Sequence, residues 1–205
     1  MTAPNVTAPP VTALPEQLQD LLFRQPRTAH AFAAEPVTEE QIQLVHDLAR
    51  YGPTAFNSQP LRVVLVRSAA ARERLLPHLS SGNRAKTAAA PLVAVLAADT
   101  GFPQRLPELF PYEPRAAEWF ADPAQREHHA RLNAALQAGY FLIAVRAAGL
   151  AAGPMSGFDP AGVDAAFFPD GRLRSFLVVL IGHPAAGPGR ERPPRLGYDD
   201  VVSQV

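Results

Sequence analysis

YGPTAFNSQP, residues 51–60, is an uncharged stretch that lies between a predicted helix and a predicted strand. It combines threonine, asparagine, serine and glutamine, and a proline stands near each of its ends. Proline and short polar side chains are common in turns because they restrict or hydrogen-bond the backbone, so this composition alone indicates an ordinary connection. The surrounding sequence decides how the stretch is interpreted.

The elements on either side of this turn have clear local signals. TEEQ at residues 38–41 matches a capping box, and residues 42–49 then carry apolar side chains at helical spacing until Gly52. LRVVLV at residues 61–66 is short and rich in branched side chains, which is typical of a strand. The chain is therefore expected to pass from a helix through the turn into a strand.

A second, longer helix is predicted in the other half of the chain. It begins at residues 122–123, where aspartate precedes proline, and it continues to Gly149. Its apolar positions, among them Leu132, Leu136 and Tyr140, keep a helical period. We expect this helix to be the longest one and to lie at the centre of the core.

The remaining elements complete an α+β architecture, in which a small sheet of three strands lies between helical layers. We expect one domain over residues 14–205, a disordered lead-in at residues 1–13, and an extended tail from Gly182 onward. The other predicted elements are helices at residues 14–23, 69–79 and 160–167, and strands at residues 92–97 and 176–181.

Residues 101–122 fit neither the helical nor the strand period. They hold five aromatic residues and four prolines. A connection of that length without secondary structure is usually functional when it occurs inside a compact domain. Two interpretations stay open: a lid or binding loop, or an excursion that covers the core or a subunit partner.

Charge and cysteine content narrow the class of function. The 205 residues include 19 Lys and Arg and 19 Asp and Glu, so no net charge attracts nucleic acid or an anionic membrane, and we expect neither partner. The absence of cysteine excludes disulfides, thiolate metal sites and a cysteine nucleophile, and it is compatible with the cytoplasmic location that we expect. The apolar residues 88–98 are too few for a bilayer span, which takes about 20 residues.

Familiar catalytic motifs are missing from the sequence, which contains no G-x-S-x-G, no phosphate-binding P-loop and no H-E-x-x-H. His128 and His129 are adjacent and point in different directions on a helix, so a solvated helix face is preferred to a metal site, and we expect no metal. The glycines of GLAAGPMSG, residues 149–157, are spaced by four, which does not match the dinucleotide fingerprint. Any nicotinamide cofactor would be held in another way.

Five short segments, each ordinary by itself, gain meaning from their order in the chain. They are RT at residues 27–28, PTAFNSQP at 53–60, an Asn-x-x-Lys before an Ala-Pro strand at 83–91, PMSGF at 154–158 and RL at 195–196. In this order they resemble the nitroreductase family of FMN-dependent oxidoreductases, and the likeness extends from about residue 18 to residue 201. It is closest to the subfamily that reduces malonic semialdehyde to 3-hydroxypropanoate, because RLPELFP and EWF occur in the loop where members with different substrates differ.

The resemblance implies a nitroreductase-like α+β fold and an obligate-type homodimer with FMN at the subunit interface. NADPH or NADH would be the electron donor in a ping-pong reaction, and an aldehyde, nitro compound or quinone would be the acceptor. A broad nitroaromatic or quinone reductase is an alternative function, and a flavin-binding protein without turnover is an alternative of another class. No side chain is assigned a catalytic role.

The FMN phosphate is a dianion, and a guanidinium can donate two hydrogen bonds to it at once. By the resemblance, Arg27 and Arg195 would bind this phosphate together with the Thr28 hydroxyl. His30 stands where other members carry a basic residue near the phosphate, so it is a weaker candidate, and Arg192 is weaker still.

The isoalloxazine ring needs different partners at its pyrimidine edge and at N5. By the resemblance, the Asn83 amide would match the pyrimidine edge, and the Lys86 ammonium would stabilise the negative charge that collects near N1 on reduction. A backbone N–H of Ser156 or Gly157 would donate to N5, which glycine permits because it allows close approach. Other members often have glutamate where Ser156 stands, so only the backbone role carries over.

Two further groups of residues complete the implied site. Pro154 and Met155 would lie against a face of the ring. By the resemblance, the turn at residues 53–60 would reach the flavin site from the second subunit. Small uncharged side chains suit such a buried interface because they leave no unpaired charge in it. The turn residues that would contact the partner's FMN are Pro53, Thr54, Ala55 and Asn57.

Overall fold

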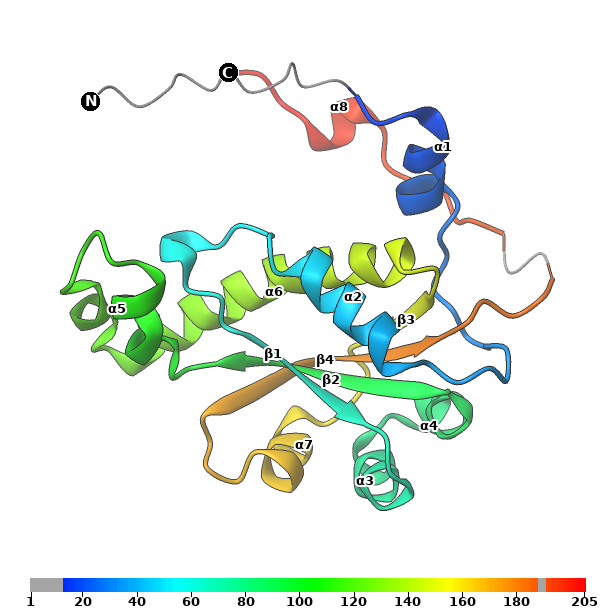
Figure 1. Ribbon diagram of the computed structural model, residues 1–205, viewed down its shortest axis with the longest axis horizontal. Helices are drawn as coiled ribbons and strands as arrows, with labels where there is room; N and C mark the ends of the chain where they lie inside the picture. The colour runs from blue at the N-terminus through cyan, green and yellow to red at the C-terminus, as the bar shows by residue number, and fades with distance from the viewer. Residues whose placement is uncertain (1–12, 188–190) are drawn as a thin grey trace.

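A four-stranded antiparallel sheet lies between two layers of helices (Figure 1) in the computed structural model, which describes residues 13–187 and 191–205. Neighbouring strands follow the order β1-β2-β4-β3, so β1 and β3 form the two edges. Most of the predicted lead-in, residues 1–12, lies outside the described part of the chain. The strands are β1 Leu61–Val66, β2 Leu92–Asp99, β3 Ala151–Met155 and β4 Leu173–Gly182.

Helices α2 and α6 cover one face of the sheet, and α3, α4 and α7 cover the other (Figure 1). The α1 and α8 segments both lie beyond the α6 side of the sandwich (Figure 1). The helices are α1 Glu16–Gln19, α2 Glu39–Ala49, α3 Ala69–Leu75, α4 Ser81–Ala89, α5 Leu106–Leu109, α6 Pro123–Ala147, α7 Pro160–Phe167 and α8 Tyr198–Val201. Shorter turns are η1 Asp20–Arg24, which is π-helical, and the 3-10 turns η2 Ala55–Asn57, η3 Leu76–His78, η4 Phe102–Arg105 and η5 Ala116–Phe120.

Strand β2 is buried along its whole length because helices cover both faces of the sheet. Leu92 and Leu96 belong to the hydrophobic cluster on the α2 and α6 side. Val93 and Val95 belong to the cluster on the α3 and α7 side. Successive side chains of a strand point to opposite faces, so this one apolar run supplies both cores.

Several local predictions are confirmed. The Thr38 hydroxyl accepts the Gln41 N–H at 3.2 Å, and the Gln41 side chain accepts the Thr38 N–H at 3.0 Å, which completes the capping box of α2. Asp122 caps α6, whose bounds agree with the predicted long helix. Helix α7 and strand β1 have the predicted bounds.

Three predictions about secondary structure are wrong. The sheet has a fourth strand, β3, which the sequence hides because it contains Gly153 and Pro154; an edge strand tolerates a proline, since one side of its backbone needs no partner. The predicted helix at residues 69–79 is shorter, and α4 follows it as a separate helix. The tail is not wholly extended, because α8 forms a short helix near its end.

The predicted core face of α6 is also wrong. Leu132, Leu136 and Tyr140 are 55%, 50% and 42% exposed, so they lie on the outer side of the helix. The buried side instead carries alanines together with the polar residues Asn133 and Gln137. The sequence favoured the larger apolar side chains of α6 as the core face, but the structure exposes them.

The segment at residues 101–122 is not structureless, because η4, α5 and η5 form short helical turns within it. Phe102 and Phe120 are buried in a cluster with the first half of α6, so part of this segment covers the core. His129 is half-buried there, with its ring 4.8 Å from that of Phe102, and it does not lie on a solvated face as we expected. His128 is exposed.

Candidate functional site

The segment that carries Arg27 lies against strand β3. The Ala29 N–H donates to the carbonyl oxygen of Ala152 at 2.9 Å. A Cβ added to Gly153 would collide with the carbonyl oxygen of Ala29, so only glycine permits this close approach. The N-terminal segment is therefore held at the edge of the sheet, next to the C-terminal end of α6.

A cleft of about 500 Å³ opens between this segment, the end of α6 and the tail. Five of the predicted cofactor residues line it, from three separate parts of the chain. These are Arg27, Thr28, His30, Pro154 and Arg195. The other lining residues are Leu22, Pro26, Leu142, Ile143, Arg146, Ala151, Ala152, Glu191, Arg192 and Pro193.

The arginines of the cleft are fixed by backbone carbonyls. Arg27 donates through Nη1 to the carbonyl of Gln25 at 2.7 Å, and Arg192 donates through Nη2 to that of Pro26, also at 2.7 Å. Burial, and then the positive charges of Arg27 and Arg195, lower the pKa of Arg192. Cations that repel one another in a cleft form a site for an anion, and guanidinium groups suit a phosphate.

Two cationic residues of the cleft were missed or underrated from the sequence. Arg146 lies in the last turn of α6, where a basic residue is ordinarily explained by the helix dipole, so its position carried no distinct signal. Arg192 lies in the proline-rich tail and was a weaker candidate than Arg195. Its donation to the carbonyls of Arg24 and Pro26 ties the tail to the N-terminal segment, which no sequence pattern indicates.

The predicted ring-binding residues form a second group around the end of β3. The Asn83 side chain donates through Nδ2 to the carbonyl oxygen of Gly157 at 2.9 Å. A Cβ on Gly157 would lie 2.9 Å from Asn83 Nδ2 and 3.0 Å from Ser80 Oγ, so a side chain there would displace these groups. Lys86 lies one turn after Asn83 on α4, and both are partly buried.

The segment between Pro154 and Gly157 presents different groups to this region. Met155 is 7% exposed and packs in the core on the α3 and α7 side, so little of its side chain is accessible. Ser156 and Gly157 follow the strand and are exposed. Their backbone, together with the half-buried Pro154, is what this segment offers to a ligand.

The turn at residues 53–60 lies elsewhere on the chain. Asn133 of α6 bonds to it, and thirteen residues of helix separate Asn133 from Arg146 of the cleft, which corresponds to about 20 Å. Asn57 donates through Nδ2 to the carbonyl of Leu109 and accepts from Gln59 Nε2, both at 2.9 Å. The turn residues therefore do not join the cleft of their own chain.

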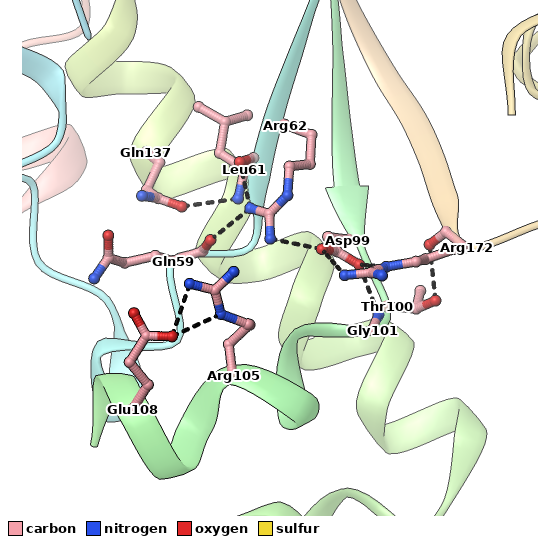
Figure 2. Close-up of polar contacts among 10 residues, drawn as sticks. All are labelled: Gln59, Leu61, Arg62, Asp99, Thr100, Gly101, Arg105, Glu108, Gln137 and Arg172. Atoms are coloured by element: carbon pink, nitrogen blue, oxygen red, sulfur yellow. Dashed lines mark hydrogen bonds and ion pairs between the residues drawn. The ribbon is translucent and has the colours of Figure 1, made fainter. Parts of the chain in front are cut away.

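A buried carboxylate fixes the sheet beside this turn (Figure 2). Asp99 is fully buried at the end of β2 and lies 2.6 Å from Arg62 Nη2 and 2.7 Å from Arg172 Nε. Burial raises its pKa, but the Arg172 hydrogen bond, the charge of Arg62 and the Gly101 N–H outweigh this effect, so the pKa lies below its usual value. Arg62 also donates to the carbonyl of Gln59 at 3.0 Å, which connects the carboxylate to the turn.

Residues 13–187 and 191–205 contain no group of three or more His, Cys, Asp or Glu side chains placed to hold a metal ion. No helix within the same ranges combines the length and the apolar character needed to cross a bilayer.

The fold and cleft define an α+β protein with an arginine-lined cleft at a sheet edge. The family model of the nitroreductase family matches residues 24–183, so the chain belongs to this family. A protein of Streptomyces coelicolor that is provisionally named NADH dehydrogenase/NAD(P)H nitroreductase is 57% identical over 188 residues, which cover 91% of this chain and 95% of that protein.

Solved structures share the fold. A crystal structure from Bacillus subtilis, provisionally named a nitroreductase, matches with a TM-score of 0.81 at 21% identity over 90% of this chain and 97% of that one. A provisionally named nitroreductase of Exiguobacterium sibiricum, crystallised in complex with FMN, matches with a TM-score of 0.80 at 17% identity over 95% and 100% of the two chains. The expected nitroreductase-like fold is confirmed.

Proposed function

We propose that this member of the nitroreductase family, an FMN-dependent NAD(P)H oxidoreductase, reduces malonic semialdehyde to 3-hydroxypropanoate. The observation that carries the flavin proposal is the cluster of arginines in the cleft beside β3, within a fold that is also seen in complex with FMN in the Exiguobacterium sibiricum protein. The electron donor is NADPH or NADH. The nicotinamide would lie against the flavin, so neither donor is preferred.

The residues of the chain fit FMN at both ends of the cofactor. Arg27, Thr28, His30 and Arg195 line the cleft and would hold the phosphate, with Arg192 as a further donor. The cleft fits an anion because the guanidinium groups of Arg27, Arg192 and Arg195 all line it. Burial, and then the charges of the other two arginines, lower the pKa of Arg192. When bound, FMN supplies hydride transfer from NAD(P)H to the acceptor.

The ring would be held where β3 ends. Asn83 and Lys86 would face its pyrimidine edge, and the backbone N–H groups of Ser156 and Gly157 would be available to N5. In the proposed reaction the aldehyde carbon takes up a hydride, and its oxygen takes up a proton from solvent or from a side chain. NAD(P)H is oxidised, and no side chain forms a covalent intermediate.

We also propose a homodimer in which each turn at residues 53–60 contacts the partner's flavin. The outer sides of α2 and α6, which lie side by side (Figure 1), expose large apolar side chains, and such patches mark interfaces. Pro53, Ala55 and Asn57 are exposed and lie far along α6 from the cleft of their own chain. The apolar residues of the proposed interface are Leu44, Leu48, Leu132, Leu136 and Tyr140.

A nitroaromatic or quinone acceptor is the second candidate. It is favoured by the name of the Streptomyces coelicolor relative, which includes NAD(P)H nitroreductase. The exposed aromatic side chains of Tyr112 and Trp119 would offer flat surfaces to such acceptors. The aldehyde is favoured by the RLPELFP and EWF segments in the same loop.

The first test is the visible absorption spectrum of the freshly purified protein, followed by identification of the released chromophore. Flavin bands with about one FMN per chain support the proposal, and a colourless protein that takes up no added FMN contradicts it. Steady-state rates with malonic semialdehyde and with nitrofurazone then separate the two acceptors. A higher kcat/KM for nitrofurazone would favour the second candidate.

A further inference from the structure

One side of α6 carries a row of polar residues that the flavin proposal does not use. His129, Asn133 and Gln137 are spaced by four residues, so they lie one above the other on the same face of the helix. Asn133 and Gln137 are 2% and 7% exposed. Amides are costly to bury without hydrogen bonds, so each of them is expected to have a specific partner.

Both amides hold backbone groups of the segment that contains the turn. Asn133 Oδ1 accepts the Ala55 N–H at 2.8 Å, and Gln137 Oε1 accepts the Leu61 N–H at 2.9 Å (Figure 2 shows the second bond). The Asn133 amide also donates through Nδ2 to the carbonyl oxygen of His129 at 2.9 Å, which orients its oxygen toward Ala55. The first bond therefore supports the turn, and the second supports the start of β1.

The turn requires such support because its backbone is strained. Phe56, Asn57 and Gln59 have φ angles of 55°, 49° and 42°, which lie in the left-handed region that residues other than glycine rarely adopt. Strain of this kind persists only where surrounding contacts impose it, and it is common at functional sites.

Side chains from elsewhere in the fold impose this conformation. The Phe56 ring packs edge-on against Phe110 and Trp119, with centroids 5.6 and 5.3 Å away. The buried Ser58 hydroxyl lies 3.1 Å from Nε2 of His129, the first member of the polar row. The turn is thus held between the segment at residues 101–122 and α6.

We infer that Asn133 is a positioning residue for the flavin reaction: by binding the Ala55 N–H it holds the strained turn in the shape that the partner's cofactor contacts. This inference rests on the proposed function. Asn133 itself touches neither the flavin nor the cleft, and it acts through Ala55 and its neighbours.

Gln137 provides the matched control, since it is a buried amide on the same face of α6 that also accepts one backbone N–H. Asn133→Leu and Gln137→Leu each replace the amide by an apolar side chain and leave one backbone N–H without its acceptor. Both variants are expected to lower the thermal midpoint by a similar amount. Only Asn133→Leu is expected to raise the Kd for FMN, by at least about tenfold, whereas Gln137→Leu stays within about twofold of the wild type.

The measurement is a fluorescence titration of each apoprotein dimer with FMN, together with the kcat and KM for NAD(P)H. Equal losses of FMN affinity in the two variants would overturn the inference, because a merely structural role affects both alike. A wild-type protein that binds no FMN would overturn the proposed function itself, so the two failures are distinguishable.

A second pair of variants covers the case in which Asn133→Leu does not fold. Phe56 is 37% exposed, so its replacement threatens the core less. Phe56→Gly and Phe56→Ala both remove the ring, but glycine adopts the positive φ angle without steric cost and alanine does not. If the flavin needs the strained turn, the Kd for FMN rises more in Phe56→Ala than in Phe56→Gly. Equal values would contradict the inference.

Discussion

Asp99 accepts two hydrogen bonds from one guanidinium, at 2.7 Å from Arg172 Nε and at 2.9 Å from Arg172 Nη2. This fork joins the end of β2 to Arg172, the residue directly before β4, and Arg62 binds the same carboxylate from β1. Three neighbouring strands are therefore joined through one buried charge, next to the turn that we assign to the partner's flavin.

Asp99→Asn is expected to lower the free energy of unfolding by about 3 kcal/mol, because it leaves two arginines without their anion. The pKa of Asp99 is lower in the folded protein, so its contribution is complete above the unfolded value of about 3.9 and is lost as the pH falls through the folded-state pKa. Urea unfolding at several pH values measures both effects. An Asp99→Asn variant whose stability falls below pH 4 as steeply as that of the wild type would contradict this assignment.

His129 is expected to produce a second pH dependence. Burial, and then the charge of His128, lower its pKa, so the unfolded chain binds a proton at a higher pH than the folded protein does. Stability is therefore constant above about pH 6.5 and decreases as the pH falls from there to the folded-state pKa. His129→Gln should remove this part of the decrease, whereas His128→Gln should retain most of it, because burial is the larger cause of the lowered pKa.

The arginines of the cleft are expected to bind the FMN phosphate. Arg27→Ala and Arg192→Ala each remove charge-assisted hydrogen bonds worth about 1.5–3 kcal/mol, so the Kd for FMN should rise about 10- to 100-fold. Arg115→Ala is the control, because Arg115 is exposed and pairs with Glu118 in the loop after β2. Unchanged FMN affinity in both cleft variants would show that the phosphate binds elsewhere.

Gly157 is expected to be needed for the flavin ring and less for the fold. A methyl group in Gly157→Ala would press on Asn83 and Ser80 and so move the groups proposed to face the ring, which should shift the flavin absorption bands and lower kcat. Gly82→Ala is the matched control, since a Cβ there meets no atom within 4 Å. It should leave the spectrum unchanged and stabilise α4 by about 0.5–1 kcal/mol.

The outer stripe of α6 is expected to form the dimer interface. Leu136→Glu places a charge in the middle of this stripe, where burial against a partner would be costly. Sedimentation analysis should show a monomer, and FMN should be lost with the partner's turn. Ala70→Glu, on the exposed side of α3, should remain dimeric. A dimeric Leu136→Glu protein would place the interface on another surface.

Several residues that were grouped from the sequence line one cleft in the structure, whereas the burial of α6 was predicted wrongly. Arg27 and Arg195 were placed by their order among known family segments, which does not require knowing their contacts. The inner face of α6 was misjudged because Asn133 and Gln137 look like surface residues, while Leu136 looks like a core residue. Their true environments depend on what packs against the helix, and local periodicity does not report this.

The glycine spacing in GLAAGPMSG illustrates the same limit. The spacing by four excluded a dinucleotide fingerprint, but it did not reveal strand β3. Position 153 needs glycine because a Cβ there would collide with the carbonyl oxygen of Ala29, and position 157 because a Cβ there would press on Asn83. Ala29 and Asn83 are both far away in the chain. Each requirement becomes visible only when the distant segment is in place.

Helix α6 has 25 residues and contacts two separate regions. Its first half bonds to the turn at residues 53–60, and its last turn lines the arginine cleft. In the proposed dimer, each helix would therefore contribute to two flavin sites at once. A subunit with a damaged cleft and a subunit with a damaged turn, each inactive as a homodimer, would complement one another when mixed. The hybrid would contain one site with both defects and one site with none.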